Sequence, residues 1–210
     1  MRKAFVVASA LLVLCGSAVG QPSPEQKAEA QKLARRAVEL LNRGEDLTDP
    51  TAKRAAYSEG LALAEQAVEL DHDNADAHFA VFGNRGRILL LDGTVPNPVS
   101  LLSVNRDLDR ALELDPNHSD ALAAKGGLYR QLPWALGGSL SRAETCLTKA
   151  IAVDPNAVGA RIELAATYRD MGKTERCRPL LEKALAIAER DGKQRQRHEA
   201  EALMKELSAP

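Results

Sequence analysis

Aromatic side chains are scarce in this chain of 210 residues, at 3% of the sequence, and only one of them is a tryptophan. Hydrophobic residues nevertheless make up 45% of the chain, and alanine and leucine supply most of them. Small and aliphatic side chains with few rings are typical of closely packed helices. The composition therefore favours an all-α protein.

The sequence also lacks the short motifs that carry common enzymatic chemistry. It has no glycine-rich nucleotide loop, no pair of CxxC motifs, no zinc-type His/Glu helix and no serine nucleophile flanked by glycines. The histidines do not have the spacing of metal ligands; they are His72, His78, His118 and His198. We expect no catalytic residues, no metal and no cofactor.

An excess of positive charge is absent too. The chain carries 28 basic and 29 acidic side chains, a net charge of −1. Without residues 1–20, which contain Arg2 and Lys3, 26 basic side chains face 29 acidic ones and the net charge is −3. Such a balance does not attract a phosphate backbone, so nucleic acid is excluded as a partner.

Residues 1–20 have the pattern of a secretory signal peptide. Two basic residues precede an apolar run from Ala4 to Cys15, which is too short to span a bilayer comfortably. Small residues follow at Ala18 and Gly20, where a signal peptidase requires them, and this predicts cleavage before Gln21. The mature chain is then periplasmic or secreted.

Two other fates of this segment stay open, an uncleaved anchor and a lipoprotein modified at Cys15. The bulky Leu14 stands where the lipoprotein signal prefers a small residue, which disfavours lipidation. No second apolar run follows, so we expect no membrane span in the mature chain. Cys146 and Cys177 remain after cleavage and are interpreted as buried thiols, with a disulfide as the alternative.

One short phrase recurs along the mature chain, an alanine inside an apolar helix that is followed by an Asp-containing stop. Its alanines are Ala67, Ala111, Ala150 and Ala184, which lie 44, 39 and 34 residues apart. A period in this range predicts a solenoid in which each unit buries its apolar face against its neighbours. Such a fold predicts binding and does not name the partner.

Helical spacing and turn residues divide residues 25–210 into helical hairpins that follow a short linker at 21–24. The first helix is expected to end at Arg43, with a break from Gly44 to Pro50. The last helix carries a single apolar stripe, as a capping helix does. The predicted hairpins span about 25–72, 75–116, 119–155 and 157–190, and the cap spans 194–207.

These residues resemble the tetratricopeptide repeat family, whose paired antiparallel helices recur every 34 residues. The fourth hairpin has the family's pattern at Leu164, Ala165, Tyr168, Gly172, Leu181 and Ala184. The third has it at Leu122, Gly126, Tyr129, Ala143, Leu147, Ala150 and Pro155. The second departs from it, with Phe82 in place of a small residue and Arg85 in place of the aromatic one. The resemblance implies a superhelical solenoid and structural roles for the pattern residues.

A narrower likeness concerns the phrase from Leu132 to Gly138. It is similar to a phrase in periplasmic repeat proteins related to the T component of tripartite ATP-independent (TRAP) transporters, and in proteins similar to regulators of microtubule dynamics. The chain is shorter than is typical of the transporter component. Insertions in the second and third hairpins lengthen the loops between their helices, and such loops often build a binding face.

The concave groove of this architecture is lined by the first helix of each hairpin. We expect its lining to include Asp76, Phe79, Arg87, Asp120, Arg130, Ile162, Arg169 and Asp170. The three arginines recur at nearly equivalent places, which suits a clamp for a carboxylate. The preferred alternative is that they are solvated or paired with Asp76, Asp120 and Asp170.

Trp134 lies in the loop of the third hairpin. It is interpreted as a plug over the hairpin core, with an exposed anchor for a partner as the alternative. The sequence thus favours an exported scaffold that binds a protein or peptide, and leaves an oligomer open. The second hypothesis is an accessory subunit of a solute transport system of the TRAP type, and an enzyme is the third.

Overall fold

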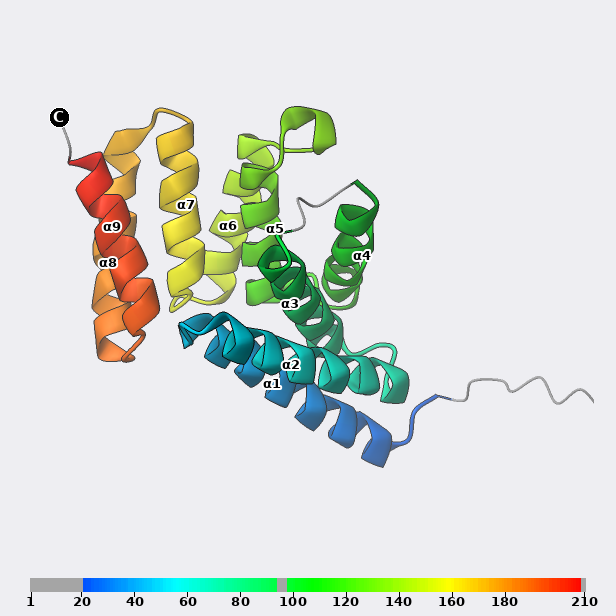
Figure 1. Ribbon diagram of the computed structural model, residues 1–210. Coiled ribbons are helices and arrows are strands. Elements are labelled where there is room, and N and C mark those ends of the chain that lie inside the picture. The colour runs from blue at the N-terminus through cyan, green and yellow to red at the C-terminus, as the bar shows by residue number, and fades with distance from the viewer. Residues whose placement is uncertain (1–20, 94–97, 209–210) are drawn as a thin grey trace, which may run out of the picture.

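The computed structural model describes residues 21–93 and 98–208, which form helices and contain no strand (Figure 1). This confirms the all-α fold. The predicted signal peptide with Cys15 lies outside the described residues. None of the helices within the described ranges is long and apolar enough to cross a membrane.

The helices alternate between a first and a second member of each hairpin. The first members are α1 (Pro24–Asp46), α3 (Ala75–Leu91), α5 (Ser119–Gln131) and α7 (Val158–Asp170). The second members are α2 (Pro50–Leu70), α4 (Pro98–Leu114), α6 (Leu140–Val153) and α8 (Cys177–Arg190). The helix α9 (Gln194–Leu207) ends the stack, and short 3-10 turns lie at η1 (Trp134–Leu136) and η2 (Thr174–Arg176).

Polar side chains fix where several of these helices begin. Ser23 and Gln26 form a capping box at the start of α1, and Asp49 and Asn74 accept backbone N–H bonds at the starts of α2 and α3. The cap of α5 is His118, an unusual residue at this position. This places an imidazole where two repeats meet.

Small side chains let the paired helices approach one another. Fully buried alanines line the contacts of α1, α2 and α3, among them Ala34, Ala37, Ala64 and Ala80. Asn84 is also fully buried, and its side-chain amide donates to the carbonyls of Ala37 and Ala80 at 3.2 and 2.9 Å. The first two hairpins are therefore joined by close backbone packing and by a buried polar link at Asn84.

The first helix is longer than the sequence predicts. It continues through Gly44 to Asp46, and Gly44 lies against the ring of Tyr57 with no room for a side chain. The glycine therefore serves close helix packing and does not end the helix. In the fourth hairpin, the 3-10 turn η2 precedes α8, which begins at Cys177, so Pro179 lies within the first helical turn, where proline is tolerated.

The second hairpin replaces the tyrosine of the repeat pattern with a different contact. The guanidinium groups of Arg142 and Arg176 stack over Tyr129 and Tyr168, at 3.9 and 4.1 Å from the ring centroids. Arg85, at the corresponding position, instead lies 2.8 Å from Asp107 on α4 and 2.9 Å from Glu65 on α2. In the second hairpin, ion pairs between the helices thus take the place of the stacked tyrosine.

The core is divided and is thinnest between the second and third hairpins. One large cluster runs through α5 to α9, and smaller clusters join α1, α2 and α3. Between them lies a small cluster of Phe79, Leu108, Ala111 and Ala121. Figure 1 shows α5 to α9 standing side by side while α1 and α2 run across one end of them. The candidate site lies at the bend between these two parts.

Candidate partner-binding cleft

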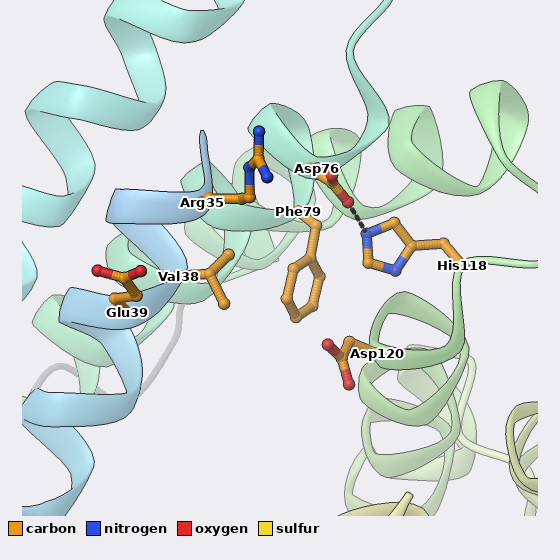
Figure 2. A pocket seen from close by; sticks show the side chains of 7 residues that line it. All are labelled: Arg35, Val38, Glu39, Asp76, Phe79, His118 and Asp120. Atoms are coloured by element: carbon orange, nitrogen blue, oxygen red, sulfur yellow. Dashed lines mark ion pairs between the residues drawn. The ribbon is translucent and has the colours of Figure 1, made fainter. Parts of the chain in front are cut away.

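A cleft of about 290 Å³ opens where the three successive first helices α1, α3 and α5 meet (Figure 2). Its walls come from three different hairpins and combine charged and apolar side chains. They are Arg35, Val38, Glu39, Asp76, Phe79, His118 and Asp120. Residues from distant parts of the sequence therefore meet at the thinnest joint of the core.

Helical periodicity places these side chains. On α1, positions 35, 38 and 39 lie on one face because residues three and four apart are neighbours on a helix. Asp76 lies in the first turn of α3, and Phe79 follows one turn later on the same face. His118 and Asp120 belong to the start of α5. Figure 2 shows Val38 and Phe79 in the middle of the cleft, between Glu39 and Asp120.

His118 links the helix cap to the neighbouring repeat. In the neutral imidazole, its Nδ1 accepts the backbone N–H of Ala121 at 3.3 Å. Its Nε2 then carries the proton and lies 3.0 Å from Oδ1 of Asp76 on α3. The imidazole is also packed beside Phe79, with 5.0 Å between ring centroids. A single buried side chain thus caps α5 and contacts α3.

Asp76 is the centre of a polar network that extends to α1. Its other oxygen accepts a hydrogen bond from Nε2 of Gln31 at 2.5 Å, and Oε1 of Gln31 accepts one from the amide of Asn74 at 3.1 Å. The network crosses from α1 to α3 and, through His118, to α5. It fixes the relative positions of the three helices that line the cleft.

The network shifts the pKa values of both partners. The imidazole of His118, 3.0 Å away, lowers the pKa of Asp76 most; burial raises it and Gln31 lowers it, with a net shift below the ordinary value of 3.8. Burial lowers the pKa of His118, but Asp76, Asp120 and Asp115 together outweigh this and raise it above the ordinary value of 6.5. Asp76 therefore stays ionised beside the imidazole.

Asp120 differs from Asp76 because it has no such partner. Among the described residues it makes no ion pair within 4.0 Å, and it lies at the open mouth of the cleft. One side of its carboxylate faces solvent, yet the surrounding chain desolvates the rest and raises its pKa. Three carboxylates against the guanidinium of Arg35 give the lining a net charge of −2 with His118 neutral and −1 with His118 protonated, so the lining is acidic in either state.

Three of the residues predicted from the sequence meet in this cleft: Asp76, Phe79 and Asp120. The sequence reasoning missed the contribution of α1, which supplies Arg35, Val38 and Glu39, although the rule that first helices line the groove applies to α1 as well. It also missed His118. A histidine directly before a helix that starts with Ser119 and Asp120 was the available signal, as a candidate cap.

The predicted arginines lie outside this cleft and are engaged with acidic side chains of the same chain. Arg87 pairs with Glu45 at the end of α1. Arg130 lies 2.9 Å from Glu163 and 3.2 Å from Asp170. Arg169 lies 2.8 Å from Asp170 and 3.0 Å from Glu206 on α9. This geometry supports ion pairing over a carboxylate clamp, although only Asp170 among the expected acidic partners takes part.

Ile162 packs at the edge of the large core cluster through α5 to α9 and does not line the cleft. The interpretation of Trp134 as a plug is wrong, because its side chain is 88% exposed. The space between α5 and α6 is already filled: Gly126 lies against Leu147, and Arg142 covers Tyr129. An indole therefore finds no room in the hairpin core and remains on the surface.

The cysteines of the described chain are free thiols. Cys177 is buried and its Sγ donates to the carbonyl of Ala165 at 3.2 Å, while Cys146 is partly buried. Burial raises the pKa of both thiols, which disfavours the reactive thiolate. Neither cysteine belongs to the cleft.

The fold is similar to those of solved repeat proteins. One is PilF of Pseudomonas aeruginosa, with a TM-score of 0.54 and 15% identity over 89% of this chain and 79% of PilF. Another is TTC0263, a thermophilic tetratricopeptide repeat protein of Thermus thermophilus, with a TM-score of 0.52 and 21% identity over 85% of this chain and 89% of TTC0263. At these identities the likeness establishes the fold, that of a tetratricopeptide-type repeat protein. Comparison with curated protein sequences gave no match.

The family model described as regulator of microtubule dynamics protein 1-3 matches residues 19–208. The match covers every described helix together with the cleft. Of the two narrower likenesses inferred from the phrase at 132–138, it confirms the one to regulators of microtubule dynamics. The chain therefore belongs to the family of regulator of microtubule dynamics protein 1-3.

Proposed function

We propose that the chain is an exported repeat scaffold that binds a protein or peptide partner through its concave side and its long inter-helix loops. The observation that carries the proposal is the cleft, because three successive hairpins each contribute side chains to one open hollow that combines charged and apolar residues. Elsewhere, the charged residues predicted to line the groove are neutralised by partners within the chain. The cleft therefore retains charged side chains that can bind another molecule.

The loop between α5 and α6 provides a second contact. Trp134 and Leu136 are exposed there, and exposed tryptophans are frequent anchors at protein interfaces. The cleft lies at the start of α5 and this loop at its end, so the two are separated by a helix of 13 residues. That corresponds to about 20 Å, which is short enough for one extended peptide or one protein surface to reach both.

The alternative, an accessory subunit of a TRAP-type transport system, calls for a hydrophobic ligand cavity or a ring-shaped oligomer. The cleft has about 290 Å³ and a charged lining, at the lower limit of pockets that enclose small molecules. Catalysis is disfavoured by the state of His118. Both of its ring nitrogens lie against groups of this chain, the backbone N–H of Ala121 and the carboxylate of Asp76, so the imidazole serves the helix cap and the contact with α3.

Affinity capture from the cell envelope tests the proposal. The bait is the mature chain, residues 21–210, in four forms: unchanged, Asp120→Arg, Trp134→Ala and Glu182→Arg. Asp120→Arg reverses the charge at the mouth of the cleft, and Trp134→Ala removes the exposed ring. Glu182 is exposed on α8, away from both surfaces, so its reversal controls for net charge.

We expect an envelope protein that is retained by the unchanged chain and by Glu182→Arg and is depleted with Asp120→Arg. Depletion with Trp134→Ala as well assigns the loop to the same interface. Equal retention by all four forms contradicts recognition through these surfaces. A ring-shaped oligomer with a bound small molecule supports the transport alternative instead.

A further inference from the structure

We propose that the cleft between α1, α3 and α5 binds a cationic side chain, a lysine or an arginine, that projects from the partner. The inference rests on the proposed binding function and specifies its chemistry. It reverses the sign expected from the recurring arginines, which suggested a site for a carboxylate. The proposal follows from the size of the cleft, the charges around it and the apolar residues in its middle.

The size of the cleft fits one long side chain. The open cleft of about 290 Å³ has room for several water molecules. The side chain of lysine has five heavy atoms and that of arginine has seven, so either fits together with a few remaining waters. A folded element of a partner does not fit, and the partner must therefore present the side chain from an extended or protruding segment.

The charges favour a cation. Glu39, Asp76 and Asp120 surround the cleft from three different helices, and Arg35 is the one cation among its lining residues. Glu39 is already bound by Arg36 at 2.9 Å and Asp76 by His118, whereas Asp120 makes no ion pair among the described residues. Asp120 is therefore the main contact for an incoming charge. A charge-assisted hydrogen bond to it compensates for its desolvation.

The apolar residues suit the stem of such a side chain. Val38 and Phe79 lie in the middle of the cleft, with the carboxylates of Glu39 and Asp120 on opposite sides (Figure 2). Lysine and arginine pack their methylene groups on apolar surface while the charged end remains polar. An acidic side chain meets the same apolar residues but three repelling carboxylates. The cleft thereby discriminates by charge as well as by length.

A titration followed by NMR tests this directly. The mature chain labelled with ¹⁵N is titrated with three blocked tripeptides, each with alanine on both sides of a central arginine, norleucine or glutamate. The backbone amides of Val38, Phe79 and Asp120 report on the cleft, and the indole N–H of Trp134 reports on the loop. The variants are Asp120→Asn and Glu39→Gln, with Glu182→Gln as the control of equal charge change.

We expect the arginine peptide to shift the cleft amides and to saturate with a dissociation constant on the order of 1 mM, as for a weak single-residue contact. Asp120→Asn and Glu39→Gln are expected to weaken binding about fivefold each, and Glu182→Gln to leave it unchanged. The norleucine peptide should bind at least several-fold more weakly. The glutamate peptide should leave the cleft amides in place.

Each contrary outcome overturns the proposal in a recognisable way. Equal shifts with the norleucine or glutamate peptide contradict the cationic specificity but leave the cleft as a peptide site. Shifts confined to the indole of Trp134, or no shift with any peptide, show that the cleft does not take this side chain. The scaffold function then still depends on the capture experiment, in which partner retention is measured without assuming a charge.

Discussion

Nη2 of Arg195, in the first turn of the last helix, lies 2.6 Å from Oε2 of Glu45, at the end of the first helix, although 150 residues separate them. Glu45 is only 14% exposed and also pairs with Arg87 on α3. An acidic residue at a helix C-terminus and a basic one at an N-terminus both oppose their own helix dipoles. The two ends meet, so each charge is favourable to the other helix. This contact joins the end of the first helix to the start of the last one.

Removal of this contact should loosen the whole stack. Arg195→Ala leaves Glu45 with one partner in a largely buried position, which should lower the free energy of unfolding by about 1–2 kcal/mol. For a chain of this size that corresponds to a fall in the unfolding temperature of about 2–8 °C. Thermal unfolding followed by circular dichroism measures it.

The control for this change is Lys32→Ala, which removes an exposed pair with Glu29 at 3.3 Å within α1. Such a pair contributes less than about 1 kcal/mol. If Arg195→Ala costs no more than Lys32→Ala, the long-range pair does not hold the first hairpin in place.

The joint between α3 and α5 should respond to pH in a defined window. Because the pKa of His118 is raised in the folded chain, the stabilisation that its protonated form gives is fully present below pH 6.5, the ordinary pKa. This stabilisation is lost as the pH rises through the raised pKa. Because the pKa of Asp76 is lowered in the folded chain, the stabilisation that its ionised form gives is fully present above pH 3.8, the ordinary pKa. This stabilisation is lost as the pH falls through the lowered pKa. The pair is therefore most stabilising between these limits.

The test compares urea unfolding of the unchanged chain and of His118→Asn, because asparagine keeps a capping side chain but does not titrate. The stability difference between the two proteins should be largest near pH 5 and should shrink toward pH 8. A difference that stays constant across this range would show that the imidazole acts only as a helix cap.

The desolvated carboxylate of Asp120 should carry a stability cost. Burial raises its pKa, so its charged form is disfavoured in the folded chain. Asp120→Asn removes the charge and weakens binding of a cationic peptide; because the side chain is partly exposed and lies in the first turn of α5, the rise in unfolding temperature should be no more than about 2 °C. Calorimetry on both proteins at pH 7 measures the change in unfolding temperature. A lower unfolding temperature in the variant would mean that Asp120 is a structural residue.

The proposed export makes a prediction about the N-terminus of the protein isolated from its own cells. Cleavage before Gln21 gives a chain that begins at Gln21, measurable by intact mass and N-terminal sequencing. A lipid-modified chain that begins at Cys15 would support the lipoprotein alternative in place of cleavage before Gln21. A chain that retains Met1 would contradict cleavage.

Much of the fold follows from the sequence because it depends on local signals. Helical spacing and turn residues indicate the hairpins, and the small residues at Ala150 and Ala184 mark the helix contacts, where both are fully buried. These features recur with the repeat, so one hairpin supports the interpretation of the next. Trp134 does not recur with the repeat, so the repeat pattern gives no indication of whether its side chain is buried or exposed.

The candidate site was less accessible to sequence reasoning because it depends on how the repeats are stacked. Asp76 and Phe79 are recognisable from their helix face, but the contact between Asp76 and His118 requires the position of α5 relative to α3. The same holds for Arg169, whose partner Glu206 comes from the capping helix. Long-range ion pairs depend on the angle between repeats, which the periodicity leaves undetermined.

The central claim is that a partner occupies the cleft, and site-specific photo-crosslinking in the native cells tests it most directly. A benzoylphenylalanine at position 35 places the reactive group on the lining of the cleft, and the same residue at position 182 places it on the exposed surface of α8. The account predicts a discrete protein adduct from position 35 that disappears when Asp120→Arg is added, and none from position 182. An absence of adducts at position 35, or the same adducts from both positions, would contradict recognition through the cleft.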